Sequence, residues 1–423
     1  MEINYKNFFK LFFSFSFYFI GISSFFLNNV VRVDYYLIFY FWIFYFFKSD
    51  IFDSVKGQKL IFFIIILLLY FIPSISILYI YKIDTTYILF IVVIFMDILN
   101  KFSDELFYSK KVEISKNVNS NIRFLIYLLL LTWSVIGPFF LGQDNNIVGI
   151  LSHIVPSALS LIYLEGILRS SKSSLNSSLI ILFHFLFIIF FLNNHWSGYG
   201  RLHLGFYLLA PIIIFISVYN ISIKNIFIFI AAPIALFLLQ YFRYNTEINL
   251  ENVTFGSAGY HLYLTDIIFN NQYDVNINSI KVWIDELKLL FLIWFPREYW
   301  ELKPIGISMW SVDLMFGRTV ESYSQSVGFI GEQKLILGDK YIFGIMLMLI
   351  LILIFRKLIV YLSFGSNVPA IIFDLNLMSY FWGGMALFGS RLWFSLIPAI
   401  LFLIFRYIFL RILKFNDKNK IHF

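Results

Sequence analysis

The chain contains about twelve apolar stretches, each close to the length of a membrane-spanning helix. A helix needs ~20 mostly apolar residues to cross ~30 Å of hydrocarbon, because an unpaired backbone group there costs several kcal/mol. Hydrophobic residues make up 60% of the chain and charged residues only 13%, which excludes an ordinary soluble domain. We therefore predict an all-α, polytopic integral membrane protein. The stretches cover residues 8–27, 33–47, 60–81, 85–100, 122–141, 146–168, 178–193, 202–219, 223–240, 341–361, 370–388 and 392–412.

Lysine and arginine residues divide unequally between the two sides of this predicted bundle. With a cytoplasmic N-terminus, 20 of them lie on the cytoplasmic side and 4 in the opposite short loops. The other 8 fall in one segment too long to obey the positive-inside rule. The bias predicts that both termini are cytoplasmic and that the number of spans is even. The net charge of +7 is then a topology signal and gives no support for nucleic acid binding.

The apolar stretches divide the chain into three parts. Residues 1–240 form an N-terminal membrane bundle of about nine spans, whose first stretch lacks a small-residue cleavage site and is expected to remain as a span. Residues 241–340 form one large extracytoplasmic loop, and residues 341–423 form about three further spans and a cytoplasmic tail. The absence of cysteine excludes disulfides, thiolate metal sites and a cysteine nucleophile.

The large loop contains one stretch with helical periodicity. The apolar residues Trp283, Leu287, Leu290 and Trp294 recur at helical spacing, and Pro296 follows them. The charged residues Asp285, Glu286 and Lys288 lie off this stripe. Two interpretations remain open: an amphipathic helix in the outer membrane interface, or a core helix of a small outer domain.

Basic residues of the outer side are the candidates for binding an anion. Arg297 and Lys303 lie in a charged, aromatic loop that two prolines make stiff. Arg201 and Arg391 each lie beside glycines at the predicted outer end of a span, and Arg318 lies further along the loop. Arginine binds phosphate bidentately, so these side chains could converge on a diphosphate headgroup. The alternative for Arg297 is an ion pair with a nearby acid.

Two motifs carry a resemblance to a known family. Phe295 to Pro304 reads F-P-R-x-x-W-x-x-K-P, and Gly328 to Glu332 reads G-x-x-G-E before the next span. With the predicted topology, these motifs resemble those of O-antigen polymerases, the Wzy-type polymerases of oligosaccharide repeat units. The resemblance implies a GT-C-like membrane glycosyltransferase of O-antigen or related surface polysaccharide, acting at the periplasmic face of the bacterial inner membrane.

The resemblance also implies roles for individual residues. The enzyme would move a growing glycan from one undecaprenyl pyrophosphate to the terminal sugar of another lipid-linked unit. Arg201, Arg297 and Arg391, supported by Arg318 or Lys303, would stabilise the departing pyrophosphate. These cations would replace a metal, so no metal or cofactor is expected. Membrane lipids, a chain-length regulator and a flippase are the other expected partners. The general base would be Glu332 first, followed by three alternatives: His195, His203 and His261.

Two other functions fit the same architecture. An O-antigen ligase differs only in transferring the glycan to the lipid A core. A flippase or secondary transporter would show short loops, two related halves and midplane polar residues. The large loop weighs against the transporter.

Several ionisable residues fall inside the predicted spans. Asp97 with Lys101 and Glu165 with Arg169 have the spacing of structural ion pairs. His184 and His153 are expected to bind neighbouring helices, and Asp374 lies near the inner end of its span.

Overall fold

The computed structural model describes part of the chain. The described residues are 54–55, 57–81, 83, 85–104, 120–141, 146–171, 174–195, 201–219, 221, 223–224, 259–270, 280–293, 295, 299–304, 306–307 and 327–419. The predicted spans 8–27 and 33–47 lie outside them, as does nearly all of 223–240. The described residues include the other predicted spans.

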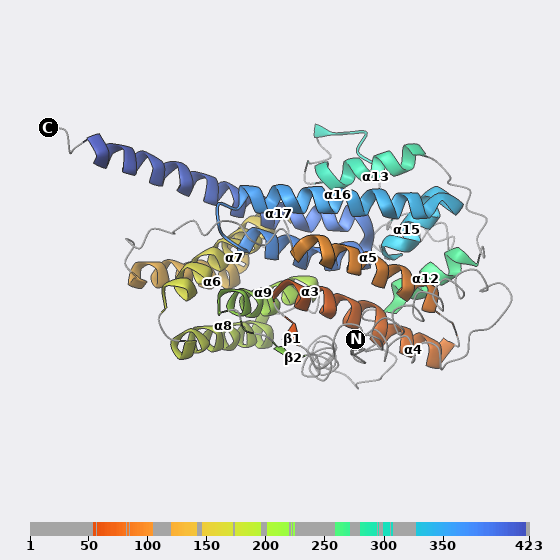
Figure 1. Cartoon of the computed structure of the whole chain (residues 1–423), viewed down its shortest axis with the longest axis horizontal. Helices are drawn as coiled ribbons and strands as arrows, with labels where there is room; N and C mark the ends of the chain where they lie inside the picture. The colour runs from red at the N-terminus through yellow and green to blue at the C-terminus, as the bar shows by residue number, and fades with distance from the viewer. Residues whose placement is uncertain are drawn as a thin grey trace, which may run out of the picture.

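The first half of the described chain is a series of helices that coincide with predicted spans. Figure 1 shows many of them running in similar directions, as in a bundle. Ser54–Val55 (β1) and Ile223–Lys224 (β2) pair as a minimal antiparallel ladder. The helices are α3 (Gly57–Ile65), the π-helix η1 (Ile66–Phe71), α4 (Ile72–Tyr81), α5 (Thr86–Asp104), α6 (Ser120–Leu141), α7 (Asn146–Ser170), α8 (Ser174–His195) and α9 (Arg201–Tyr219).

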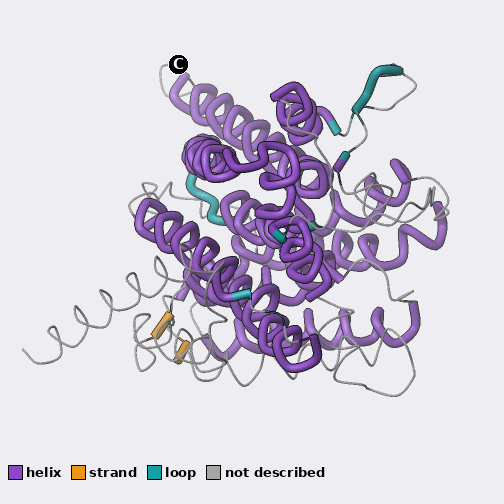
Figure 2. The backbone as a smooth tube through the Cα atoms, turned by 90° about the vertical axis from the view of Figure 1, so that its right-hand side faces the viewer, coloured by secondary structure: helices purple, strands orange, loops and turns teal. Residues whose placement is uncertain are grey.

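The C-terminal part contributes further helices to the same bundle. Figure 2 shows the same helical bundle from the side. By length and composition, three helical stretches are apolar enough to cross a membrane: Lys59–Leu78, Gly328–Leu362 and Val368–Ile412, the last of which is interrupted at Gly384. The helices are α12 (Tyr260–Phe269), α13 (Ile280–Leu292), α15 (Gly328–Leu337), the short 3-10 helix η4 (Gly338–Lys340), α16 (Tyr341–Leu362) and α17 (Val368–Asn419).

The described parts of segment 241–340 pack into the bundle. Helix α12 contacts α15, and both α13 and α15 contact α17. Helix α15 is almost wholly buried, and Phe329 and Ile336 have no exposed surface. Gly338, at a φ of 56°, turns the chain from α15 into η4 and α16. Segment 241–340 therefore contributes to the same hydrophobic core as the predicted spans.

Helix α17 is a hairpin of two helical arms, which we call the first arm (368–383) and the second arm (385–419). Gly384 between them has φ 79° and ψ −167°, outside the helical region. Asn376 in the first arm donates to the Ser395 hydroxyl in the second at 3.2 Å, although 19 residues separate them. In a straight helix they would lie ~28 Å apart. The two predicted spans of this region are therefore two arms that fold back on each other.

The turn of this hairpin does not lie where the sequence predicted it. We expected a loop at Gly389 to Arg391, but these residues are helical and the chain turns at Gly384. Both positions carry glycine in an apolar stretch, so hydropathy alone could not choose between them. Positive φ is available to glycine at little cost, and contacts from other helices fix it at Gly384.

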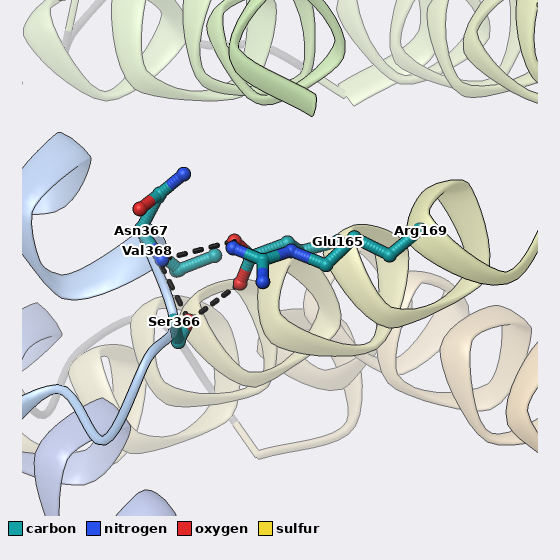
Figure 3. A network of polar contacts seen from close by, with 5 residues as sticks. All are labelled: Glu165, Arg169, Ser366, Asn367 and Val368. Atoms are coloured by element: carbon teal, nitrogen blue, oxygen red, sulfur yellow. Dashed lines mark hydrogen bonds and ion pairs between the residues drawn. The ribbon is translucent and has the colours of Figure 1, made fainter. Parts of the chain in front are cut away.

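Polar contacts of α7 support the junction before α17. Arg169 donates to Glu165 at 2.7 Å, as predicted. Glu165 also accepts bonds from the Ser366 hydroxyl and the Asn367 backbone, which connects α7 to the start of α17 (Figure 3). The expectation for His184 is confirmed as well, because its ring nitrogen lies 2.7 Å from the Tyr127 hydroxyl of α6. The side chains of Lys101 and His153 lie outside the described residues.

Asp374 of the first arm has an ion-pair partner in α16. Its carboxylate receives two hydrogen bonds from Arg356, at 2.9 and 3.1 Å, and both side chains are fully buried. Arg356 is one of the 20 lysine and arginine residues that the sequence analysis places on the cytoplasmic side. In the structure Arg356 connects two helices inside the bundle.

Candidate functional site at the α17 hairpin turn

The turn at Gly384 breaks the backbone hydrogen bonding of α17. In a continuous helix the Met385 amide would donate to the Phe381 carbonyl, four residues earlier. Here two side chains replace that bond. The Met385 amide donates to both oxygens of Glu332, at 3.1 and 3.0 Å. The Phe381 carbonyl accepts a hydrogen bond from the Tyr70 hydroxyl at 2.8 Å.

Glu332 lies at the N-terminus of the second arm. A carboxylate is favoured there, because the first amides of a helix lack partners and carry partial positive charge. Glu332 is 3% exposed. A Cβ at Gly384 would lie only 2.5 Å from its Oε1 atom, so both the backbone angle and the available space require glycine.

Tyr70 reaches the turn from the π-helix η1. π-Helical turns are rare and frequently occur at functional sites. The Tyr70 ring packs edge-to-face on His261 of α12, with 5.3 Å between ring centroids. His261 in turn lies against Gly328, the first residue of α15. Four separate segments of the chain therefore meet around the turn.

A second buried carboxylate, Glu286, lies beside the turn. Its Oε1 atom accepts a hydrogen bond from the Ile307 amide at 2.6 Å, whereas its buried Oε2 atom has no partner among the described residues. The neighbouring residue Gly306 packs on Ala386, the second residue of the second arm. Burial, assisted by the charge of Asp285 and opposed by the Ile307 hydrogen bond, raises the pKa of Glu286 to about 7.

The structure corrects the sequence interpretation of α13. The predicted helix is present, but Glu286, expected off the packed stripe, is buried together with Leu289 and Leu290. Trp283 and Leu287 are only partly buried. The buried face of α13 is rotated relative to the predicted apolar stripe, because it is the face that lies against α17. There the Trp393 indole donates to the Leu290 carbonyl at 2.7 Å. One face of α13 thus packs on the bundle, whereas Ile280, Ile284 and Leu292 are exposed.

Arg391 lies in the second arm, on the side away from α13. Gly389 and Trp393 face Leu290 of α13. Arg391 is two residues from each of them, so its side chain is rotated by about 200° around the helix axis from theirs. Its Nη1 atom is buried and has no hydrogen-bond partner among the described residues. A buried donor without a partner is costly, because it has given up its hydrogen bonds to water.

Lys303 has a different position from the one expected for an anion ligand. Its ammonium group donates to the carbonyls of Ile293 at 2.6 Å and Phe295 at 2.8 Å. These carbonyls follow the last turn of α13, where a cation is favourable. Lys303 therefore donates hydrogen bonds to backbone carbonyls at the C-terminal end of α13.

The other predicted site residues are only partly covered by the described chain. His195 ends α8, and Arg201 and His203 lie in the first turn of α9, but their side chains lie outside the described residues. Arg297 and Arg318 lie outside them entirely. Of the nine predicted site residues, the structure describes the side chains of Glu332, His261, Lys303 and Arg391.

Glu286 and Tyr70 were not predicted from the sequence as site residues. Glu286 lies next to the predicted apolar stripe of its helix. Because it is charged, the hydrophobic pattern assigns it to the polar, exposed face. Tyr70 is one of 27 tyrosines in an aromatic-rich chain, so no local pattern distinguishes it. The Gly383-Gly384 pair was the available signal for the turn, because glycine pairs often mark helix breaks.

Comparison with protein-family models, curated proteins and solved structures finds no match for this chain. The described structure by itself defines a helical protein with helices apolar enough to lie in a membrane.

Proposed function

We propose that this protein is a membrane glycosyltransferase that polymerises lipid-linked oligosaccharide repeat units at the periplasmic face of the bacterial inner membrane. It transfers the growing glycan from undecaprenyl pyrophosphate to the terminal sugar of a second lipid-linked unit. The bundle of about twelve spans, the GT-C-like architecture and the cytoplasmic termini are parts of the same proposal.

The observation that carries this proposal is the environment of Arg391. A buried cationic nitrogen without a partner among the described residues is costly in an apolar helix, and such residues commonly line the path of a substrate. As the anomeric bond breaks, negative charge builds on the leaving diphosphate, and a fixed guanidinium group stabilises that charge. Arg201, Arg297 and Arg318 are proposed to complete the anion site.

Arginine substitutions test this proposal. Arg391→Ala should abolish long-chain glycan while single repeat units still reach the outer surface, and the loss of one charge-stabilising donor should lower the transfer rate ~10²–10³-fold. Arg391→Lys should also lose much of the activity, because lysine keeps the charge without the planar fork. The measurement is the length distribution of surface glycan on gels.

Arg411→Ala is the matched control, because Arg411 lies in the same arm but is exposed. It should leave the glycan ladder unchanged. If Arg391→Ala gives a normal glycan ladder at normal protein levels, the proposed role of Arg391 in an anion site is contradicted. If repeat units instead accumulate inside the cell, the transporter alternative is favoured.

The O-antigen ligase remains the alternative enzyme. It would use the same anion site and leaving group but transfer the glycan to the lipid A core. The same gels separate the two, because a defective ligase leaves long polymer on the lipid carrier.

A further inference from the structure

We propose that Glu286 is the proton acceptor of the transfer reaction, an assignment that rests on the proposed function. In this step the acceptor sugar's hydroxyl proton moves to Glu286 Oε2 as its oxygen bonds the anomeric carbon. The bond from that carbon to the diphosphate breaks, and its electron pair leaves with the diphosphate. One proton and one glycosyl group are transferred, so no oxidant or further reactant is needed.

The hydrogen bonds of the two buried carboxylates distinguish their roles. Both oxygens of Glu332 accept the Met385 amide, so its carboxylate is committed to the hairpin turn. Glu286 uses only Oε1, which the Ile307 amide fixes, and its Oε2 lone pairs have no donor among the described residues. A general base needs this combination of a fixed orientation and a free oxygen.

The charges around Glu286 suit a base that works near neutral pH. Asp285 on the same helix is acidic and disfavours a second negative charge. Glu332 of α15 also faces Glu286, and the charge of Glu286 disfavours the ionised form of Glu332. Lys288 is paired with Asp285, and Lys303 binds backbone carbonyls. Burial is nevertheless the largest cause of the raised pKa of about 7. A carboxyl group with this pKa can accept and release a proton at physiological pH.

A purely structural role does not explain a glutamate at this position. Glutamine would accept the same Ile307 hydrogen bond without placing a charge in the protein interior. The raised pKa means that the folded protein disfavours the charged form, so the carboxylate reduces stability. An ionisable group retained at such a cost is typical of an acid–base residue. Its burial also keeps water from competing with the acceptor hydroxyl.

The test compares three variants of the full-length protein in proteoliposomes. The substrate is undecaprenyl-diphosphate-linked repeat units isolated from cells that lack this protein. Glu286→Gln should lower the polymerisation rate ~10²–10⁴-fold without lowering Tm. Glu332→Gln, which keeps an acceptor for the Met385 amide, should lose much less activity.

Asp285→Asn is the matched control, one residue away on the more exposed side of the same helix. It should remain active, and the acid side of its pH–rate profile should move to lower pH, because one negative charge near Glu286 is removed. A merely structural residue would not produce this movement.

The outcomes separate the two proposals. If wild-type protein forms polymer and Glu286→Gln is equally active, or if Glu332→Gln shows the large loss instead, the assignment of Glu286 is overturned and the proposed function stands. If wild-type protein forms no polymer, the proposed function fails and the assignment fails with it.

Discussion

At the scale of single residues, the bundle contains two kinds of buried charge. Arg356 and Asp374 are paired, with two hydrogen bonds between them, so each charge compensates the other. Glu286 and Glu332 form no ion pair with a cation in the described part of the chain, and each is held by a backbone amide. Paired charges connect helices, whereas uncompensated carboxylates make stability depend on pH.

The pH dependence of stability is a direct consequence of the Glu286 environment. Its pKa rises from 4.5 to about 7 on folding, so the folded protein binds the proton more tightly than the unfolded chain. The stability due to this proton is complete below pH 4.5 and is lost as the pH rises to about 7. At ~1.4 kcal/mol per pKa unit, the loss is about 3 to 4 kcal/mol.

We therefore expect Tm of the wild type to fall relative to that of Glu286→Gln between pH 5 and pH 8, as measured in detergent. The variant has no group at this position that can titrate, so its own curve should be flatter. Parallel Tm curves for the two proteins across this range would contradict the raised pKa.

At the scale of elements, the α17 hairpin depends on contacts from outside α17. Glu332 of α15 binds the start of the second arm, and Tyr70 of η1 binds the end of the first. The turn is therefore determined by tertiary structure rather than by its local sequence. It also brings Gly306 and Glu286 beside Ala386.

Gly384→Ala should destabilise the protein by more than ~2 kcal/mol, because the residue has positive φ and its Cβ would meet Glu332. Gly166→Ala in α7 is the control, since nothing lies within 4 Å of its added Cβ and alanine favours a helix. Thermal unfolding in detergent measures both. Equal Tm values for the two variants would show that the turn is not under this constraint.

The sequence predicted helices better than it predicted their ends and contacts. Apolar length is enough to locate α5 to α9, because a membrane helix satisfies its own backbone. Hydropathy could not choose between the glycines at 384 and 389, and local sequence could not show that α15 and Glu286 are buried. Those properties depend on segments distant in sequence, such as the contact between Glu332 and Met385.

At the scale of the whole molecule, the described parts of segment 241–340 pack against the apolar helices of the bundle. Its described helices α12, α13 and α15 pack against α4, α17 and each other. Helix α13 contributes Glu286 and helix α15 contributes Glu332, the two buried carboxylates of the candidate site. In Figure 1 the end of the second arm projects beyond the rest of the bundle. The proposed chemistry thus lies where this segment meets the α17 hairpin.

The most direct test of the proposed function is reconstitution of the purified wild-type protein in liposomes with undecaprenyl-diphosphate-linked repeat units. We predict a stepwise ladder of longer glycans, with one undecaprenyl diphosphate released for each bond formed. Repeat units that remain single, whether or not they cross the bilayer, would contradict the proposed function.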